Sequence, residues 1–103
     1  MMTSTDTMTI QVFPTTDHPA KLANVELVFG DGPLAGLKLV GFTVWLRPKG
    51  RHNVTFPART YAINGERRSF ALLRPQDGSP DADDALRDAI LDAYARHIQD
   101  SRK

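Results

Sequence analysis

The chain has 103 residues, a formal net charge of +1, 41% hydrophobic residues and no cysteine. This length fits one domain that can bury a core without a metal or disulfide staple, and the lack of cysteine excludes disulfides, thiolate catalysis and cysteine-ligated metals. The start of the chain lacks the basic and apolar pattern of a signal peptide, and no apolar run approaches the roughly 20 residues that span a bilayer. We therefore expect a soluble, cytoplasmic protein with no membrane contact.

The first third of the chain predicts two strands and a loop. Residues 1–7 are polar, and we expect them to be disordered. Apolar and polar side chains alternate in "MTIQVFP" (residues 8–14) and in "LANVELVF" (residues 22–29), which is typical of half-buried strands. The segment "GDGPLAG" (residues 30–36) holds three glycines and a proline, and it indicates a loop.

The segment "LKLVGFTVWLR" (residues 37–47) is the most apolar strand candidate. An unbroken alternation gives it two apolar faces, and such a strand needs cover on both sides. One helix covers one face, so the second face predicts a homodimer, unless loops or the N-terminal strand cover it. The first face would hold Leu37, Leu39, Thr43 and Trp45, and the second Val40, Phe42, Val44 and Leu46.

A turn, a short strand and a hairpin follow. Residues 48–53, "PKGRHN", are typical of a turn, and "VTFPA" (residues 54–58) predicts a short strand at an edge or a bulge, because Pro57 cannot donate to a ladder. In "FPARTYAINGERRSF" (residues 56–70), Asn64-Gly65 predicts a type I′ turn. The resulting register puts Arg59, Tyr61, Arg68 and Phe70 on one face and Arg67 on the other. The core-facing positions would be Ala58, Ala62, Ala71 and Leu73.

The end of the chain predicts a helix. Ser79 suits the N-cap, Pro80 the first helical position, and the following aspartates the positive end of the helix dipole. Apolar residues recur at helical spacing as far as Ile98. The element order predicts an α+β fold, with an antiparallel sheet of about five strands and a C-terminal amphipathic helix. One domain would span residues 8–98, followed by a frayed end at 99–103.

Charge is distributed unevenly along the chain. Residues 38–74 hold eight basic residues and one acid, for a net charge of +7, whereas residues 75–100 hold two basic residues and seven acids, for −5. Such polarised segments indicate one basic and one acidic surface. The alternative is that the acidic helix neutralises the basic sheet within the fold.

Motifs for catalysis and metal binding are missing from the sequence. His18, His52 and His97 do not have ligand spacing, no GxSxG is present, and helix capping explains the clustered aspartates. We therefore expect a protein that is not an enzyme and uses neither cofactor nor metal.

Basic residues interleaved with aromatic ones are the remaining signal. Arginine and lysine neutralise phosphates, and an exposed aromatic ring offers a face on which a base can stack. The pattern predicts binding of DNA or RNA, although arginines on an exposed strand also serve solubility and edge protection. The predicted nucleic-acid-binding residues are Arg47, Lys49, Arg51, Arg59, Tyr61, Arg67, Arg68 and Phe70.

The hairpin and the helix together resemble the SpoVG septation-regulator family. "FPARTYAINGERRSF" is similar to the family's central block, "LRDAILDAY" to its terminal helix, and the order of strands also looks alike over about residues 8–98. The resemblance implies a small homodimeric bacterial regulator, linked to septation and sporulation, that binds DNA or RNA without catalysis. The chain departs from the family pattern at Arg67, where an aromatic residue is usual, and at Ser69, where an acid is common. The positions that match are Pro57, Arg59, Gly65, Glu66 and Arg68.

Two other functions stay open. A protein-interaction module would dock a partner on the apolar sheet face or on the acidic helix. A small-molecule enzyme or sensor would require a concave apolar pocket with convergent polar groups.

Overall fold

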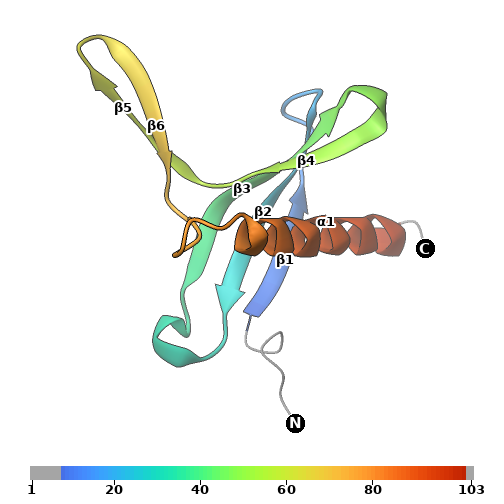
Figure 1. Cartoon of the computed structure of the whole chain (residues 1–103). Coiled ribbons are helices and arrows are strands. Elements are labelled where there is room, and N and C mark those ends of the chain that lie inside the picture. The colour runs from blue at the N-terminus through green and yellow to red at the C-terminus, as the bar shows by residue number, and fades with distance from the viewer. Residues whose placement is uncertain (1–7, 102–103) are drawn as a thin grey trace.

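The structure, a computed structural model, describes residues 8–101, and the predicted disorder of residues 1–7 lies outside that range. Over the described residues the chain forms six strands in two antiparallel sheets and one C-terminal helix (Figure 1). The predicted α+β fold is therefore confirmed, with six strands in place of about five. The elements are β1 (Met8–Pro14), β2 (Lys21–Phe29), β3 (Lys38–Arg47), β4 (Arg51–Thr55), β5 (Ala58–Ile63), β6 (Glu66–Ala71) and α1 (Asp81–Ser101).

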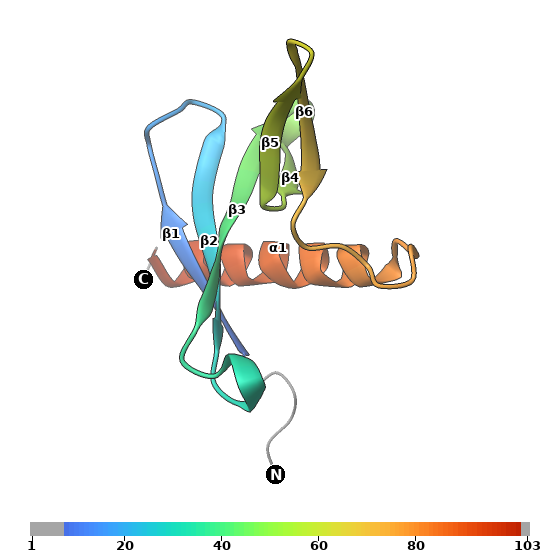
Figure 2. The same cartoon turned by 90° about the vertical axis from the view of Figure 1, so that its left-hand side faces the viewer.

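Strands β1 to β4 form an antiparallel meander in chain order, and α1 crosses one face of it (Figures 1 and 2). Ile90 of the helix is fully buried, in one cluster with apolar side chains of β2, β3 and β4. Removing this apolar surface from water is the main force that holds the helix on the sheet. The buried core consists of Ala23, Val25, Leu27, Phe42, Val44, Val54 and Ile90.

A bulge in β3 shifts its register against β2. Val25 pairs with Phe42, but Leu27 pairs with Leu39, so residues 40–41 together lie opposite a single residue of β2. A bulge of this kind places an extra residue in one strand and breaks the alternation of its side chains. Leu39 and Phe42 consequently lie on the same side of the sheet.

The unbroken alternation predicted for residues 37–46 is therefore wrong. Leu39 packs on the core beside Phe42 and Val44, whereas Leu37 and Val40 are 58% and 50% exposed. The homodimer stays a prediction, and two continuous apolar faces no longer support it, since the bulge puts Leu39 on the same side as Phe42.

The predicted turn at residues 48–53 is shorter in the structure. Lys49 and Gly50 both adopt positive φ, at 67° and 75°, which reverses the chain between Arg47 and Arg51, and these two residues pair across the ladder. The short strand predicted at residues 54–58 consequently lies earlier, as β4.

Pro57 marks the point where the chain leaves the four-stranded sheet. It is buried, and its Cβ would lie 2.9 Å from a Cβ built on Gly41, which has φ 108°. Only glycine allows this approach and this backbone conformation together. The Pro57 carbonyl accepts a hydrogen bond from the Leu72 amide at 2.9 Å, which closes the base of the hairpin that follows.

Strands β5 and β6 form a separate two-stranded hairpin that extends away from the body (Figure 1). Asn64 and Gly65 have φ of 52° and 81°, as a type I′ turn requires, and the predicted register is confirmed. The core-facing role predicted for three alanines is wrong, because the hairpin does not lie on the core; Leu73, just beyond β6, does pack there. Of these alanines, Ala58 and Ala62 are exposed and Ala71 is half-buried.

The helix begins at Asp81, one residue after the first helical position predicted at Pro80. The Ser79 hydroxyl accepts a hydrogen bond from the Asp81 amide at 3.3 Å, which satisfies one of the unpaired N–H groups of the first turn. The helix continues to Ser101, into the segment 99–103 that was expected to fray. No helix within residues 8–101 is long and apolar enough to cross a membrane.

Candidate nucleic-acid interface

Four of the predicted site residues share one face of the hairpin. The register pairs Arg59 with Phe70 and Tyr61 with Arg68, and directly opposed side chains point to the same side of a sheet. The ring centroids of Tyr61 and Phe70 lie 5.8 Å apart with a tilt of 58°, within the range of favourable aromatic pairs. Two guanidinium groups and an aromatic pair thus occupy one surface, which we call the hairpin face.

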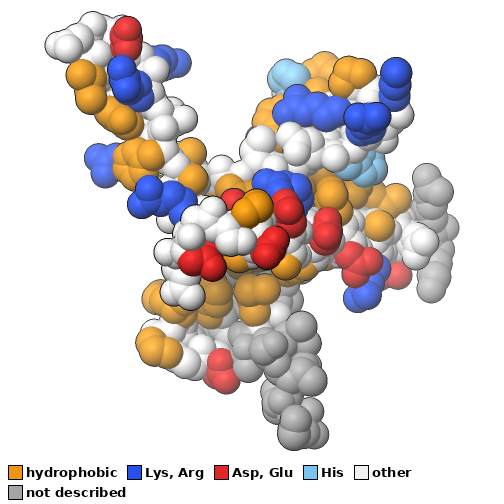
Figure 3. All heavy atoms as spheres, in the orientation of Figure 1, with side chains coloured by type: hydrophobic (Ala, Val, Ile, Leu, Met, Phe, Trp, Pro, Cys, Tyr) orange, Lys and Arg blue, Asp and Glu red, His pale blue; other side chains and the backbone are white. Residues whose placement is uncertain are grey.

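The hairpin face is open to solvent. Every residue of β5 is exposed, as are all residues of β6 except the last. Tyr61 and Phe70 keep 39% and 41% of their surface exposed. Large apolar side chains grouped on an exposed surface are typical of interaction sites. Figure 3 shows the hairpin as a protrusion on which basic and hydrophobic side chains alternate.

The arginines of the hairpin are weakly engaged within the chain. Arg68 contacts Glu66 with a nitrogen–oxygen distance of 3.1 Å, but both side chains are more than half exposed, and exposed ion pairs contribute little. Within the described residues, no carboxylate lies at ion-pair distance from Arg59 or Arg67. These guanidinium groups are available to an anionic ligand.

Arg67 lies apart from the other two arginines. It pairs with Ala62, on the face of the hairpin opposite to Arg59 and Arg68, as the predicted register indicated. The three arginines therefore do not form one cluster, and a flat ligand on the hairpin face would not contact Arg67.

A second basic region lies at the turn between β3 and β4. Arg47 and Arg51 are directly opposed across the ladder, and like charges in that position destabilise a sheet unless an anion relieves them. Lys49 lies at the tip, and the region borders a shallow hollow of about 460 Å³. The residues that line this hollow are Arg47, Pro48, Lys49, Arg51, His52 and Asn53.

An aromatic cluster beside this turn was missed by the sequence reasoning. The His18 and Trp45 rings form a T-shaped pair with 5.8 Å between their centroids, and the Arg47 guanidinium lies 5.7 Å from the centroid of the Trp45 ring. The Trp45 indole donates a hydrogen bond to the Thr55 hydroxyl at 2.9 Å. The loop before β2 brings His18 here, since the Leu46 amide donates to the carbonyl of Ala20 at 2.7 Å.

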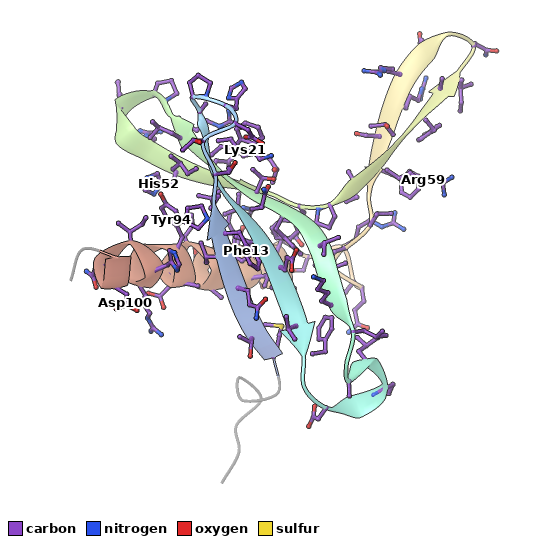
Figure 4. All side chains as sticks on the ribbon, turned by 180° about the vertical axis from the view of Figure 1, so that it is seen from behind. Phe13, Lys21, His52, Arg59, Tyr94 and Asp100 are labelled. Carbon is purple, nitrogen blue, oxygen red and sulfur yellow. The ribbon has the colours of Figure 1, made fainter. Side chains whose placement is uncertain are left out.

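The two basic regions do not meet in one copy of the chain. Figure 1 shows the hairpin and the β3–β4 turn as separate protrusions, and Figure 3 shows acidic side chains over α1 below them. Figure 4 labels Arg59 on one protrusion and His52, close to the β3–β4 turn, on the other. The charge asymmetry of the sequence therefore becomes two basic protrusions above an acidic helix.

A further hollow, of about 590 Å³, lies between β1 and α1, where Arg96 pairs with Asp92 at 2.9 Å. Across residues 8–101, no three histidine, aspartate or glutamate side chains are grouped so as to hold a metal ion. The candidate interface is thus defined by the basic and aromatic residues of the hairpin and the turn.

Comparison with family models, curated proteins and solved structures finds no match to this chain. The resemblance to the SpoVG family consequently stays a prediction that depends on short motifs and on the order of the strands.

Proposed function

We propose that the protein is a homodimeric nucleic-acid-binding regulator of the SpoVG type, which acts in the bacterial cytoplasm and is not an enzyme. The observation that carries this proposal is the hairpin face, where Arg59 and Arg68 flank the exposed pair of Tyr61 and Phe70. DNA or RNA is the ligand that fits this combination of fixed positive charge and flat apolar surface.

The two kinds of side chain have different roles in the proposal. Arg59 and Arg68 contact phosphate oxygens, where binding releases condensed counterions and gives affinity without sequence preference. Tyr61 and Phe70 stack on unpaired bases, which stabilises a single strand and tolerates any base. Arg67, on the other side of the hairpin, would contact phosphates only where the nucleic acid wraps around it.

The basic turn provides a second contact. Arg47, Lys49 and Arg51 would hold phosphates at a distance from the hairpin, so one longer nucleic acid bridges the two protrusions. Binding of an anion there would also relieve the repulsion between the opposed Arg47 and Arg51.

Binding of labelled oligonucleotides tests the proposal. Single- and double-stranded oligonucleotides are titrated at low and moderate salt with the wild type and with an Arg59→Ala/Arg67→Ala/Arg68→Ala variant. We expect salt-sensitive binding by the wild type and strongly weakened binding by the variant. Equal binding by both proteins, or no binding by the wild type at low salt, would refute the proposal.

A matched control separates the site from the overall charge. Lys38→Ala/Arg96→Ala removes two positive charges from ion pairs outside both basic regions, and it is compared with Arg59→Ala/Arg68→Ala, which also removes two. The control variant should bind nearly as well as the wild type, because its lost charges lie away from the proposed path of the phosphates.

A protein-interaction module is the second candidate. It is favoured by the exposed Leu37, just before β3, and Val40, within it, and by the aspartates on the outer surface of α1 (Figure 3). A complex recovered from cell extract that survives nuclease and moderate salt would support this candidate over the first.

A further inference from the structure

Within the described part of the chain, the hairpin stands largely alone. Among the described residues, its two strands contact each other extensively, and no other element makes comparable contact with either of them. An isolated two-stranded hairpin is marginally stable in water, and a third strand or a packed face is needed for independent stability. The exposed Ile63, Tyr61 and Phe70 also lack cover. The structure therefore presents an element that is incomplete in one copy of the chain.

The two outer edges of the hairpin differ in how well they are protected. The sequence of β6 begins with three charged residues, Glu66, Arg67 and Arg68, and charges along an edge discourage pairing with another chain. Strand β5, "ARTYAI", has a single charge and no proline, and threonine, tyrosine and isoleucine all favour strands. The outer edge of β5 is thus an unprotected strand edge on a segment that stands clear of the body (Figures 1 and 4).

We propose that the β5 strands of two copies pair antiparallel across a twofold axis and form a four-stranded sheet in the order β6-β5-β5-β6. A twofold axis perpendicular to the sheet makes the interface isologous, so that the same strand serves both copies. Under this symmetry, a residue points to the same side of the sheet in both copies. Directly opposed residues also share a side, so the axis lies beside one residue of β5, which faces the same residue of the other copy. The two registers that use most of β5 place Thr60 or Tyr61 on the axis.

Both registers avoid like charges opposite each other. With Thr60 on the axis, Arg59 of each copy lies opposite Tyr61 of the other, where a cation–π contact forms. With Tyr61 on the axis, the two tyrosines are opposed, and Arg59 lies opposite Ile63. Cross-strand pairs of these kinds stabilise a sheet, so the strand is compatible with pairing to a second copy of itself.

Pairing through β5 completes the candidate nucleic-acid interface. The hairpin faces of the two copies lie side by side on one surface. This surface carries four arginines and two aromatic pairs, whereas the hairpin face of one copy carries two arginines and one aromatic pair. This consequence rests on the proposed function, whereas the pairing itself does not require nucleic acid. The alternative is that a strand of a different protein binds at the same edge, and the experiment must distinguish this from pairing between two copies of the chain.

The absence of cysteine from the chain makes the pairing testable with single-cysteine variants, in which every disulfide joins two copies. Thr60→Cys and Tyr61→Cys place a thiol on β5, and one of the two variants lies on the axis. Directly opposed Cβ atoms are about 5 Å apart, which small adjustments bring within disulfide reach. The matched controls are Ser69→Cys and Arg68→Cys, which occupy the cross-strand neighbours on β6 and lie roughly 14 Å from their symmetry mates, three strand spacings away.

The variants are purified after nuclease treatment, oxidised, and examined by non-reducing electrophoresis and sedimentation. We expect cross-linked dimer as the main species for Thr60→Cys or Tyr61→Cys, and little for the two controls. Efficient cross-linking of the β6 controls, or no cross-linking at either β5 position, overturns the proposal. Monomeric wild type at micromolar concentration overturns it as well, and a β5 edge occupied by another protein would give this result.

The two proposals fail in distinguishable ways. A cross-linked β5 dimer that binds no oligonucleotide would refute nucleic-acid binding and leave the interface standing. Salt-sensitive oligonucleotide binding by a protein without β5 cross-links would refute the interface and leave binding by the hairpin face standing.

Discussion

The two faces of the hairpin give a quantitative prediction about the salt dependence of nucleic-acid binding. The Arg59→Ala/Arg68→Ala variant removes both arginines of the hairpin face, and therefore up to two phosphate contacts per chain. Each phosphate contact contributes about 0.9 to the slope of log affinity against log salt on duplex DNA and about 0.7 on a single strand. The slope should fall by about 1.8 per chain on a duplex and about 1.4 on a single strand, and by twice as much where two copies share one nucleic acid.

The assay is a series of binding constants at salt concentrations over a fourfold range. Over such a range, a slope difference of 1.8 means that wild-type binding weakens about tenfold more per chain than binding by the variant. The control is Arg67→Ala/Arg74→Ala, which also removes two positive charges, one from the opposite face of the hairpin and one from the exposed segment between β6 and α1. If this control lowers the slope as much as the double variant does, net charge and not the hairpin face determines binding, and the reasoning from the register is refuted.

Three further predictions follow from the hairpin face and the core. Tyr61→Ala/Phe70→Ala should weaken single-strand binding by about 1–3 kcal/mol per stacked base and leave the salt slope nearly unchanged, as calorimetric titration at several salt concentrations can check; a changed slope would contradict a stacking role. Phe42→Ala should lower the free energy of unfolding by about 3–5 kcal/mol, because the ring is fully buried. Urea denaturation measures this loss, and a loss within about 0.5 kcal/mol, as at a surface site, would contradict the prediction. Gly41→Ala should destabilise by more than about 1 kcal/mol, since the new Cβ would meet Pro57 and φ is 108°; an unchanged urea midpoint would show that the bulge tolerates a side chain.

The parts of the fold that depend on neighbouring residues could be predicted from the sequence. Asn64-Gly65 defines the type I′ turn, and this turn sets the pairing of Arg59 with Phe70 and Tyr61 with Arg68. The cap at Ser79 is equally local, because its hydroxyl accepts from an amide two residues away. Periodicity and turn chemistry act over a few residues, so a single sequence contains the needed information.

The parts that depend on distant residues could not be predicted. Pro57 packs against Gly41 at the bulge, from sixteen positions further along the chain, and "LVGFT" alone does not indicate which residue makes that contact. The chain leaves the four-stranded sheet at Pro57, so the predicted fifth strand of a single sheet lies in a separate hairpin. A glycine inside a strand pattern is a known sign of a bulge or of close backbone approach, and it was the one available signal.

The candidate site, like the fold, has parts that the sequence could predict and parts that it could not. The separation of Arg67 from Arg59 and Arg68 follows from strand alternation and could be predicted. The approach of His18 to Trp45 depends on how the loop before β2 lies along β3, and the distance between the two basic protrusions depends on the exit at Pro57. Neither has a signature in the order of residues.

The position of Trp45 provides an internal spectroscopic reporter. It is the only tryptophan of the chain, and its indole is fixed by Thr55 and lies against His18 and Arg47, beside the basic turn and away from the hairpin. The intrinsic emission of the folded protein therefore senses the turn, while the tyrosine of the hairpin contributes little when tryptophan is excited selectively. A ligand that quenches or shifts this emission engages the turn, and one that binds without changing it engages the hairpin alone, so the unmodified chain can tell in which order its two protrusions are occupied.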